Sequence, residues 1–319
     1  MRMGGQLASV GADTGDSFSM LVRPHATYSL EGTVVWMTER ENPWILHREN
    51  VCCAPTDELA ATWLSGDKME DLTYMTWDAN DPWVADTYYR AYYTVSLCNE
   101  FLRHATDAAV SGFEKGAPDE ARQLKAFRAE ARFLRALSYY YVLDLFGQGP
   151  FVDETMGVGA YTPAAYTDKQ LFDFIETELK SIADDGLLAP AECEYGRASK
   201  AAAWALLAKL YLNAPTYGAG DRSTDCIAAC KKVMAAGYTL ENELFNADND
   251  KRTNEIIFPF VVSAVNTVSW GATTYIVCGQ CGNSSSQSPS AYGLTNGWGM
   301  FRVRGELPRL FAGTEKKDR

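Results

Sequence analysis

Four aromatic side chains lie in a long uncharged segment and could form a binding surface. Residues 256–301 contain no Asp, Glu, Lys, Arg or His, although 22% of the whole chain is Asp, Glu, Lys or Arg. The segment is rich in Gly, Ser, Asn and Thr, and Trp270, Tyr275, Tyr292 and Trp298 are spaced through it. Aromatic faces pack on the C–H face of a sugar ring, while amides and hydroxyls bond to its O–H groups. The segment as a whole favours a site for an uncharged, hydroxyl-rich ligand, while packing on the protein's own core stays open for any single aromatic.

The sequence contains no recognisable set of catalytic residues. It has no G-x-S-x-G, G-x-G-x-x-G or H-E-x-x-H motif and no phosphate-binding loop. Asp153 with Glu154, and Asp184 with Asp185, are adjacent acids, which seldom converge on one substrate. A glycoside hydrolase needs two facing carboxylates about 5–9 Å apart, which a sequence cannot reveal. We therefore predict a protein that is not an enzyme and needs no cofactor.

The cysteines and histidines do not form a metal-binding pattern. Cys278 and Cys281 have the spacing of a redox or zinc motif, but the sequence contains no second such pair. Cys226 and Cys230 fall on one face of a predicted helix, which suits buried small side chains as well as ligands. The 3 histidines are far apart. We expect no metal site, and the sequence leaves the pairing of the 8 cysteines open.

The charge of the chain argues against a nucleic-acid partner. Its net charge is −12 at pH 7, whereas nucleic-acid binders neutralise phosphates with Lys and Arg. A local exception is a basic stripe on the longest predicted helix, formed by Arg122, Lys125, Arg128, Arg132 and Arg135. We expect the basic stripe to face solvent or to pair with acids on a neighbouring helix. No stretch predicts a membrane-spanning helix.

Apolar side chains recur at three- and four-residue steps in five segments, which predicts five helices. The predicted helices cover residues 86–105, 119–146, 168–184, 198–213 and 223–236. Short connections between the last three predict antiparallel neighbours, as in stacked helical hairpins. The predicted core residues are Phe127, Leu134, Leu137, Tyr141, Ala202, Leu206 and Leu210. The candidate helix starts are Asp168, Ser199 and Asp225, and the candidate ends are Gly147, Gly186 and Gly237.

The longest helix and the turn after it resemble the signature of the SusD/RagB family, the surface nutrient-binding lipoproteins of the Bacteroidetes outer membrane. The family helix reads Glu-Ala-Arg-Phe-Leu-Arg-Ala, followed by tyrosines and then by Tyr/Phe-Gly-x-x-Pro. The match covers residues 130–136, Phe146, Gly147 and Pro150. These are scaffold residues, so the match indicates the fold and does not itself mark a binding site.

The resemblance continues in the same order along most of the chain. Residues 83–102 resemble a W-x-x-x-Y-x-x-I-x-x-x-N segment, with Asn99 in the matching role. Residues 196–211 resemble a helix that starts with Gly-Arg-Ala-Thr-Lys. Residues 254–258 resemble the short strand that follows the helices, and residues 307–319 resemble an L-x-x-x-F…D-x-R element, although the Asp-Arg spacing departs from it.

The resemblance implies a mostly α-helical fold, a tetratricopeptide-like helical superhelix with an irregular, loop-rich ligand-binding part that carries short strands. It divides the chain into a loop-rich N-terminal part, residues 1–85, a helical core, residues 86–240, and the start of the ligand-binding part, residues 241–319. Repeats alone do not predict this architecture, because no consensus of about 34 residues can be laid over the helices.

The resemblance also implies a function. It predicts a protein that captures an oligosaccharide or another oligomeric nutrient and delivers it to a SusC-like, TonB-dependent transporter. N-terminal loops contribute to the site in this family, so Trp77 and Trp83 join the four later aromatics as candidate ligand-binding residues. For Trp83, packing at the start of its helix is at least as strong an alternative. The ligand itself is not implied, because the aromatic loops diverge most within the family.

Two other functions stay open. The chain could be a helical-repeat scaffold that binds a protein partner, in which case the aromatic loops would be core or interface. It could also be an all-helical carbohydrate-active enzyme, which a groove with two facing carboxylates would support. A transporter gene beside this gene would instead favour nutrient binding.

The resemblance places the protein on the surface of the outer membrane, held only by a lipid anchor that this sequence lacks. Residues 1–20 do not form a signal peptide with a cleavage site followed by cysteine, and family members continue past residue 319. Trp298, Phe301 and Phe311 lie close to that end, whereas domain boundaries normally fall in polar linkers. We therefore expect the sequence to be a fragment of a longer surface lipoprotein.

Overall fold

The protein forms two compact units in the computed structural model. The helical unit comprises Met1–Val34 and Ala91–Val261, and the second unit comprises Val35–Arg90 and Val262–Arg319. The structure describes residues 59–61, 69–157, 159, 162–241, 254–259, 278, 281–282, 288–292, 294–299, 301–303 and 309.

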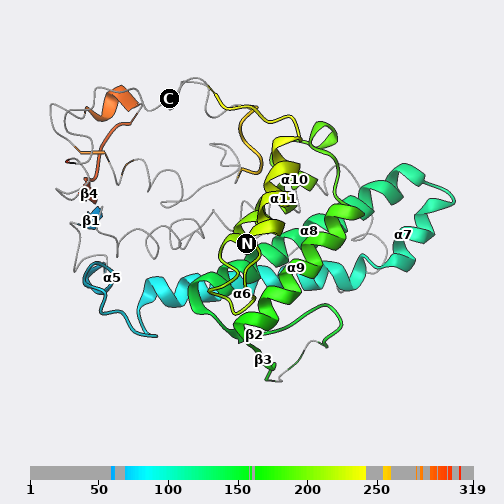
Figure 1. Ribbon diagram of the computed structural model, residues 1–319, viewed down its shortest axis with the longest axis horizontal. Coiled ribbons are helices and arrows are strands. Elements are labelled where there is room, and N and C mark those ends of the chain that lie inside the picture. Colours follow the sequence, from blue (N-terminus) through cyan, green and yellow to red (C-terminus); the bar gives the residue numbers. More distant parts are fainter. Residues whose placement is uncertain are drawn as a thin grey trace. The chain divides into compact units, whose positions relative to one another are not determined.

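Successive helices pack against one another in the helical unit. The helices are α6 (Pro82–His104), whose first turns belong to the second unit, then α7 (Asp107–Glu114), α8 (Pro118–Phe146), α9 (Asp168–Asp184), α10 (Lys200–Leu212) and α11 (Ser223–Met234). From α7 onward each helix contacts the next one along the chain, as the green to yellow ribbons of α8 to α11 show in Figure 1. A short antiparallel pair, β2 (Gly149–Pro150) and β3 (Ala165–Tyr166), lies between α8 and α9 in the chain. The predicted mostly α-helical fold is confirmed.

The described part of the second unit carries short elements. β1 (Leu59–Ala61) pairs antiparallel with β4 (Phe301–Val303), so that Leu59 lies opposite Val303. The short helix α5 (Glu70–Tyr74) follows β1, and a 3-10 turn, η2, covers Pro289–Tyr292. The strand pair joins segments that are far apart in the sequence.

All five predicted helices are present, but their caps differ from the prediction. α9 is capped by Thr167 and not by Asp168, because the Thr167 hydroxyl accepts a hydrogen bond from the Gln170 amide while the Gln170 side chain accepts one from the Thr167 amide. Ser199 occupies the cap position of α10, as predicted, yet its side chain makes no capping bond. Asp225 lies in the first turn of α11, where its charge is favourable.

Six of the seven predicted core residues are buried. They are Phe127, Leu134, Leu137, Ala202, Leu206 and Leu210. The prediction is wrong for Tyr141, which is only half-buried, while Tyr139 and Tyr140 are buried. The helix is continuous from Pro118 to Phe146, as predicted.

Tyr139 is fully buried because both its ring and its hydroxyl have partners. The ring stacks on Phe151 and meets Phe174 edge-on, each with a centroid separation of 5.4 Å. Its hydroxyl donates to the carbonyl oxygen of Val152 and accepts from the amide of Val152, each at 2.8 Å. The tyrosine therefore fixes the segment that leaves α8.

The turn after α8 depends on two glycines. Gly147 has a φ of 75°, in the left-handed region that glycine adopts without strain. A Cβ atom on Gly149 would clash with the hydroxyl of Tyr92 on α6. The Phe-Gly-Gln-Gly-Pro sequence thus ends α8 and lets β2 pass close to α6.

The basic stripe of α8 pairs with acids, which was one of the two predicted outcomes. The acids come from α7 and α9, from the segment after α8 and from the residues that follow α9. The pairs are Arg122 with Glu192, Lys125 with Asp185, Arg128 with Asp107, Arg132 with Glu178, and Arg135 with Glu178 and Glu154.

Arg135 is the most deeply buried member of the stripe, with 2% of its side chain exposed. Its guanidinium donates to the Asn99 side chain at 2.7 Å, to Glu178 at 2.9 Å and to Glu154. The Asn99 amide in turn donates to the carbonyl oxygen of Val152 at 3.1 Å. This buried network joins α6, α8, α9 and the segment after α8, so the residues that carry the family resemblance hold the helices together.

A second buried ion pair links α8 to the start of α10. Arg197 donates two hydrogen bonds to the Glu130 carboxylate, at 2.6 and 2.8 Å, and both side chains are almost fully buried. The Arg197 guanidinium also lies 4.6 Å from the centre of the Phe127 ring. The Gly-Arg-Ala-Ser-Lys sequence therefore positions an arginine for this pair.

The predicted strand at residues 254–258 is wrong. The segment forms bends, and its Phe258 ring packs edge-on against Phe133 of α8 with centroids 5.1 Å apart. The resemblance had implied a strand here, but Phe258 packs on α8 instead.

The packing of α8 predicts that Leu134→Ala lowers the free energy of unfolding by about 2–5 kcal/mol, because the change leaves a cavity in the core. Lys125→Ala on the same helix should cost about 1 kcal/mol or less, since its pair with Asp185 is exposed. Urea unfolding measures both values. Equal losses for the two variants would contradict the assignment of the buried face.

The buried charges predict a loss of stability in acid. Burial opposes ionisation of Glu178, but the hydrogen bond and charge of Arg132 and the charge of Arg135 outweigh it and hold the pKa of Glu178 below its usual range. The unfolded chain takes up the proton at about pH 4.3, so this stabilisation is fully present above about pH 5 and is lost as the pH falls through the lowered pKa.

Urea unfolding midpoints measured from neutral pH down to about pH 3 test this linkage. Glu178→Gln should flatten the acid dependence, whereas the exposed Glu192→Gln should leave it as in the unmodified protein. An unchanged slope in Glu178→Gln would show that this carboxyl does not carry the effect.

Candidate functional site

The structure describes four of the six predicted ligand-binding aromatics, and all four belong to the second unit. Trp77 is exposed, with 44% of its surface accessible. Trp83 and Trp298 are half-buried, and Tyr292 is the last residue of η2. The other two predicted site residues, Trp270 and Tyr275, lie outside the described residues.

A capped turn positions the two N-terminal tryptophans. The carboxylate of Asp81 accepts hydrogen bonds from the amides of Trp83 at 2.9 Å and Val84 at 3.1 Å, which caps α6. Just before it, the Asp78 side chain accepts from the Asn80 amide at 2.7 Å. Trp77 therefore precedes a fixed turn, while Trp83 lies in the first turn of α6.

Trp298 is fixed through its backbone against the Cys-x-x-Cys segment. Its amide donates to the carbonyl oxygen of Cys278 at 2.7 Å, and the next amide, of Gly299, donates to the carbonyl oxygen of Cys281 at 2.9 Å. A Cβ atom on Gly297 would lie only 2.5 Å from that same carbonyl oxygen. The two cysteines are buried, and their carbonyl groups anchor the aromatic residue.

The described residues carry no group of three His, Cys, Asp or Glu side chains that could hold a metal ion. Six cysteines fall within the described part of the chain, and none of them forms a disulfide bond there: Cys98, Cys193, Cys226, Cys230, Cys278 and Cys281. Burial raises the pKa of the Cys98 thiol to about 12, so it is protonated at neutral pH. Cys52 and Cys53 lie outside the described residues.

Three of the four adjacent acids that the sequence singled out have partners within the protein. Asp153 accepts hydrogen bonds from the amide and hydroxyl of Thr155, at 2.9 and 2.6 Å. Glu154 pairs with Arg135, and Asp185 pairs with Lys125. These acids therefore serve the fold.

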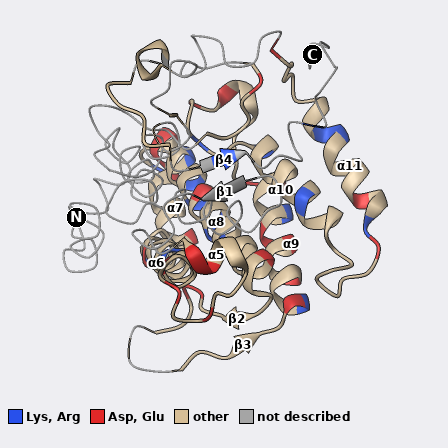
Figure 2. Cartoon of the chain, turned by 90° about the vertical axis from the view of Figure 1, so that its left-hand side faces the viewer, with Lys and Arg blue, Asp and Glu red and all other residues tan. Residues whose placement is uncertain are grey.

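Charges of both signs are distributed over the helices. Figure 2 shows basic and acidic positions together along the ribbons of α9 and of α11. Among the helices that the structure describes, none is long and apolar enough to cross a membrane.

Comparison with known proteins identifies the family. Residues 29–212 match the pattern of a SusD-like family described as "Starch-binding associating with outer membrane". The chain is also 34% identical over 263 residues to the starch-binding protein SusD of Bacteroides thetaiotaomicron. This chain belongs to the SusD-like family. The aligned region covers 81% of this chain but only 44% of that relative, so the SusD-like chain spans less than half of the relative's length.

Solved structures share the fold. A SusD superfamily protein from Bacteroides vulgatus superposes with a TM-score of 0.65 at 14% identity, covering 92% of this chain and 58% of that one. A structure with a xylogluco-oligosaccharide superposes with a TM-score of 0.66 at 18% identity, covering 89% and 55%. These neighbours confirm the predicted SusD-like helical fold. The family is named for binding and not for a reaction, which agrees with the prediction that the SusD-like chain is not an enzyme.

Sequence reasoning did not assign Asn99, Glu154 or Glu178 to the network around Arg135. The only available signal was the basic stripe itself, since five cations on one helix require acids nearby or solvent. The acids that pair with it lie between 19 and 70 positions from their arginine or lysine partners, and spacing within one helix does not reveal such partners.

The backbone contacts of Trp298 predict the effect of Gly297→Ala. The new methyl group would force residues 297–299 away from Cys281, so the environment of Trp298 should change. Fluorine NMR of protein labelled with 5-fluorotryptophan resolves the 8 tryptophans one by one. The Trp298 resonance should shift in Gly297→Ala and stay in place in the exposed neighbour Asn296→Ala; no shift in either variant would contradict the tight approach.

Proposed function

We propose that this protein captures neutral oligosaccharides at the cell surface and passes them to a SusC-like, TonB-dependent transporter in the outer membrane. The observation that carries the proposal is the 34% identity, over 81% of this chain, to a starch-binding protein. The family description, which joins starch binding to the outer membrane, supports the same location.

The ligand-binding surface we propose is an arc of aromatic residues. Trp270, Tyr275, Tyr292 and Trp298 would contribute from the uncharged segment, together with Trp77 or Trp83. The segment supports this proposal because the hydroxyl groups of a neutral sugar need hydrogen-bonding partners, while its C–H faces need flat apolar surfaces. Neither requires a charged side chain. The exposed ring of Trp77 and the anchored backbone of Trp298 are consistent with side chains held ready for a ligand.

The proposed surface should bind weakly. A ring face that buries ~60 Å² contributes ~1.5 kcal/mol at ~25 cal/mol per Å². Three such contacts give ~4.5 kcal/mol, which corresponds to roughly millimolar affinity before ordering costs. Tighter binding would need a longer oligosaccharide or additional hydrogen bonds. Such an affinity suits capture and delivery.

Titration with malto-oligosaccharides and xyloglucan oligosaccharides tests the proposed surface. Tryptophan fluorescence should change on binding, and alanine at Trp270, Tyr275, Tyr292 and Trp298 together should weaken binding at least tenfold. Trp204→Phe, which alters a tryptophan of α10 in the helical unit, is the matched control and should bind normally. Undiminished binding by the fourfold variant would rule out the aromatic arc.

Delivery to a transporter needs a separate test. If the proposal is correct, a gene for a TonB-dependent transporter lies beside this gene, and the two proteins co-purify from outer membranes. Hydrolase genes in the same neighbourhood would indicate the glycan. A locus without a transporter, and no co-purification, would instead favour the alternative of a helical scaffold for a protein partner.

A further inference from the structure

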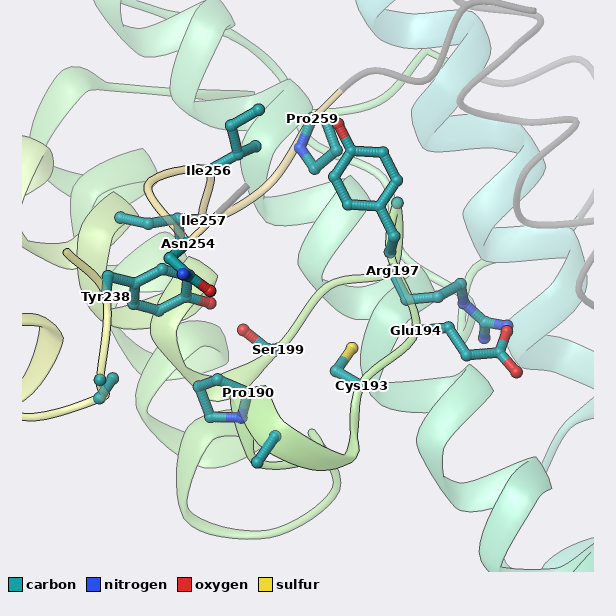
Figure 3. A pocket seen from close by; sticks show the side chains of 15 residues that line it. Pro190, Cys193, Glu194, Arg197, Ser199, Tyr238, Asn254, Ile256, Ile257 and Pro259 are labelled. Carbon is teal, nitrogen blue, oxygen red and sulfur yellow. The ribbon is translucent and has the colours of Figure 1, made fainter. Parts of the chain in front are cut away.

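The helical unit contains a pocket of about 300 Å³ that none of the predicted aromatic residues lines. Its walls come from three segments: residues 190–199 before α10, residues 236–238 after α11, and residues 254–259. Figure 3 shows these segments around a common space, with Tyr238 and Asn254 on one side and Ser199 facing them. The volume lies at the small end of small-molecule sites, which suits one ring and not a chain of rings.

Ser199 supplies an unused hydroxyl in the wall of this pocket. The residue is only 2% exposed, and its hydroxyl oxygen has no hydrogen-bond partner. A buried hydroxyl without a partner is unfavourable. The usual explanation, capping of a helix, does not apply, because Ser199 is in the cap position of α10 but its side chain makes no capping bond. In Figure 3 the oxygen points into the pocket, where a ligand could satisfy it.

The side chains opposite Ser199 are uncharged. Tyr238, Asn254, Ile256 and Ile257 surround that part of the space, so it offers an aromatic ring, an amide and two aliphatic surfaces. A sugar ring needs this combination, since its C–H groups pack on apolar surface while its hydroxyls form hydrogen bonds.

The charged residues of the lining do not favour an ion. Arg197 is neutralised by its two hydrogen bonds to Glu130, and in Figure 3 its side chain and that of Glu194 extend away from Tyr238. The start of α10 favours negative charge, but the nearby Glu194 carboxylate opposes it. Pro190 and Pro259 stiffen two of the walls, so the pocket is formed before a ligand enters.

We propose that this Ser199 pocket binds one neutral sugar ring and serves as a second subsite, built from different residues than the aromatic arc. The Ser199 hydroxyl would exchange a hydrogen bond with a ring hydroxyl, while Tyr238 and Ile256 cover the C–H groups. The choice of ligand class rests on the proposed function, whereas the pocket and its unsatisfied hydroxyl do not.

Saturation-transfer NMR with methyl glucoside tests the subsite, and methyl glucuronide serves as a probe of the same size that carries a carboxylate. The protein with its four later aromatics changed to alanine is used alongside the unmodified chain. We expect millimolar binding of methyl glucoside in both proteins and weaker binding of the uronide. Ser199→Ala should weaken binding about fivefold, and Ala191→Phe, which places a ring in the pocket, should abolish it.

Thermal unfolding separates a loss of binding from a loss of fold. Ser199→Ala should not lower the unfolding temperature, because the hydroxyl has no hydrogen bond to lose. Ser223→Ala on the exposed start of α11 should change neither binding nor the glucoside-to-uronide preference. The proposal is overturned if methyl glucoside does not bind, if Ser199→Ala and Ala191→Phe bind normally, or if the uronide binds more tightly. Loss of binding only in the fourfold aromatic variant would also overturn it and would leave the aromatic arc standing.

Discussion

The helical unit depends on the need to satisfy two buried arginines. Arg135 and Arg197 both lie in the interior, where an unpaired charge would cost several kcal/mol. Their acceptors, Glu178, Glu154 and Asn99 for the first and Glu130 for the second, come from different helices and loops. The helices must therefore meet in one arrangement before either charge is stable. Apolar packing supplies most of the driving force, while these pairs restrict which packing is acceptable.

The sequence was sufficient to predict the helices because their apolar periodicity is strong and local. The helix caps and the ion-pair partners depend on side-chain geometry, which the apolar periodicity of the sequence does not describe. Thr167 displaced Asp168 as a cap because Gln170 could complete a reciprocal pair of bonds. Tyr139 replaced Tyr141 in the core because β2 and its neighbours, which are distant from the helix pattern, cover that side of α8. The short helix α7 escaped prediction because its 8 residues give too few turns for periodicity to detect.

The candidate site was less predictable than the fold, for a physical reason. A binding surface made of aromatic side chains on loops requires each ring to be held by backbone contacts, and composition alone reveals the rings but not those contacts. Trp298 illustrates this, since its amide bonds to a carbonyl oxygen twenty residues earlier in the chain, at Cys278. No sequence pattern indicated the Ser199 pocket, because a serine just before a helix predicts an ordinary helix cap. Only the structure shows that the hydroxyl of Ser199 makes no capping bond.

The double hydrogen bond between Tyr139 and Val152 has a consequence for hydrogen exchange. A side-chain hydroxyl here bonds to both backbone groups of one residue, as a neighbouring strand would. The Val152 amide proton can exchange with solvent only when the hydroxyl withdraws, and the hydroxyl belongs to a residue that lies about two turns before the end of α8 at Phe146. That single proton therefore reports when the 29-residue helix α8 separates from the segment that follows it. Its exchange rate should follow the unfolding of the helical unit and not the fraying of a loop.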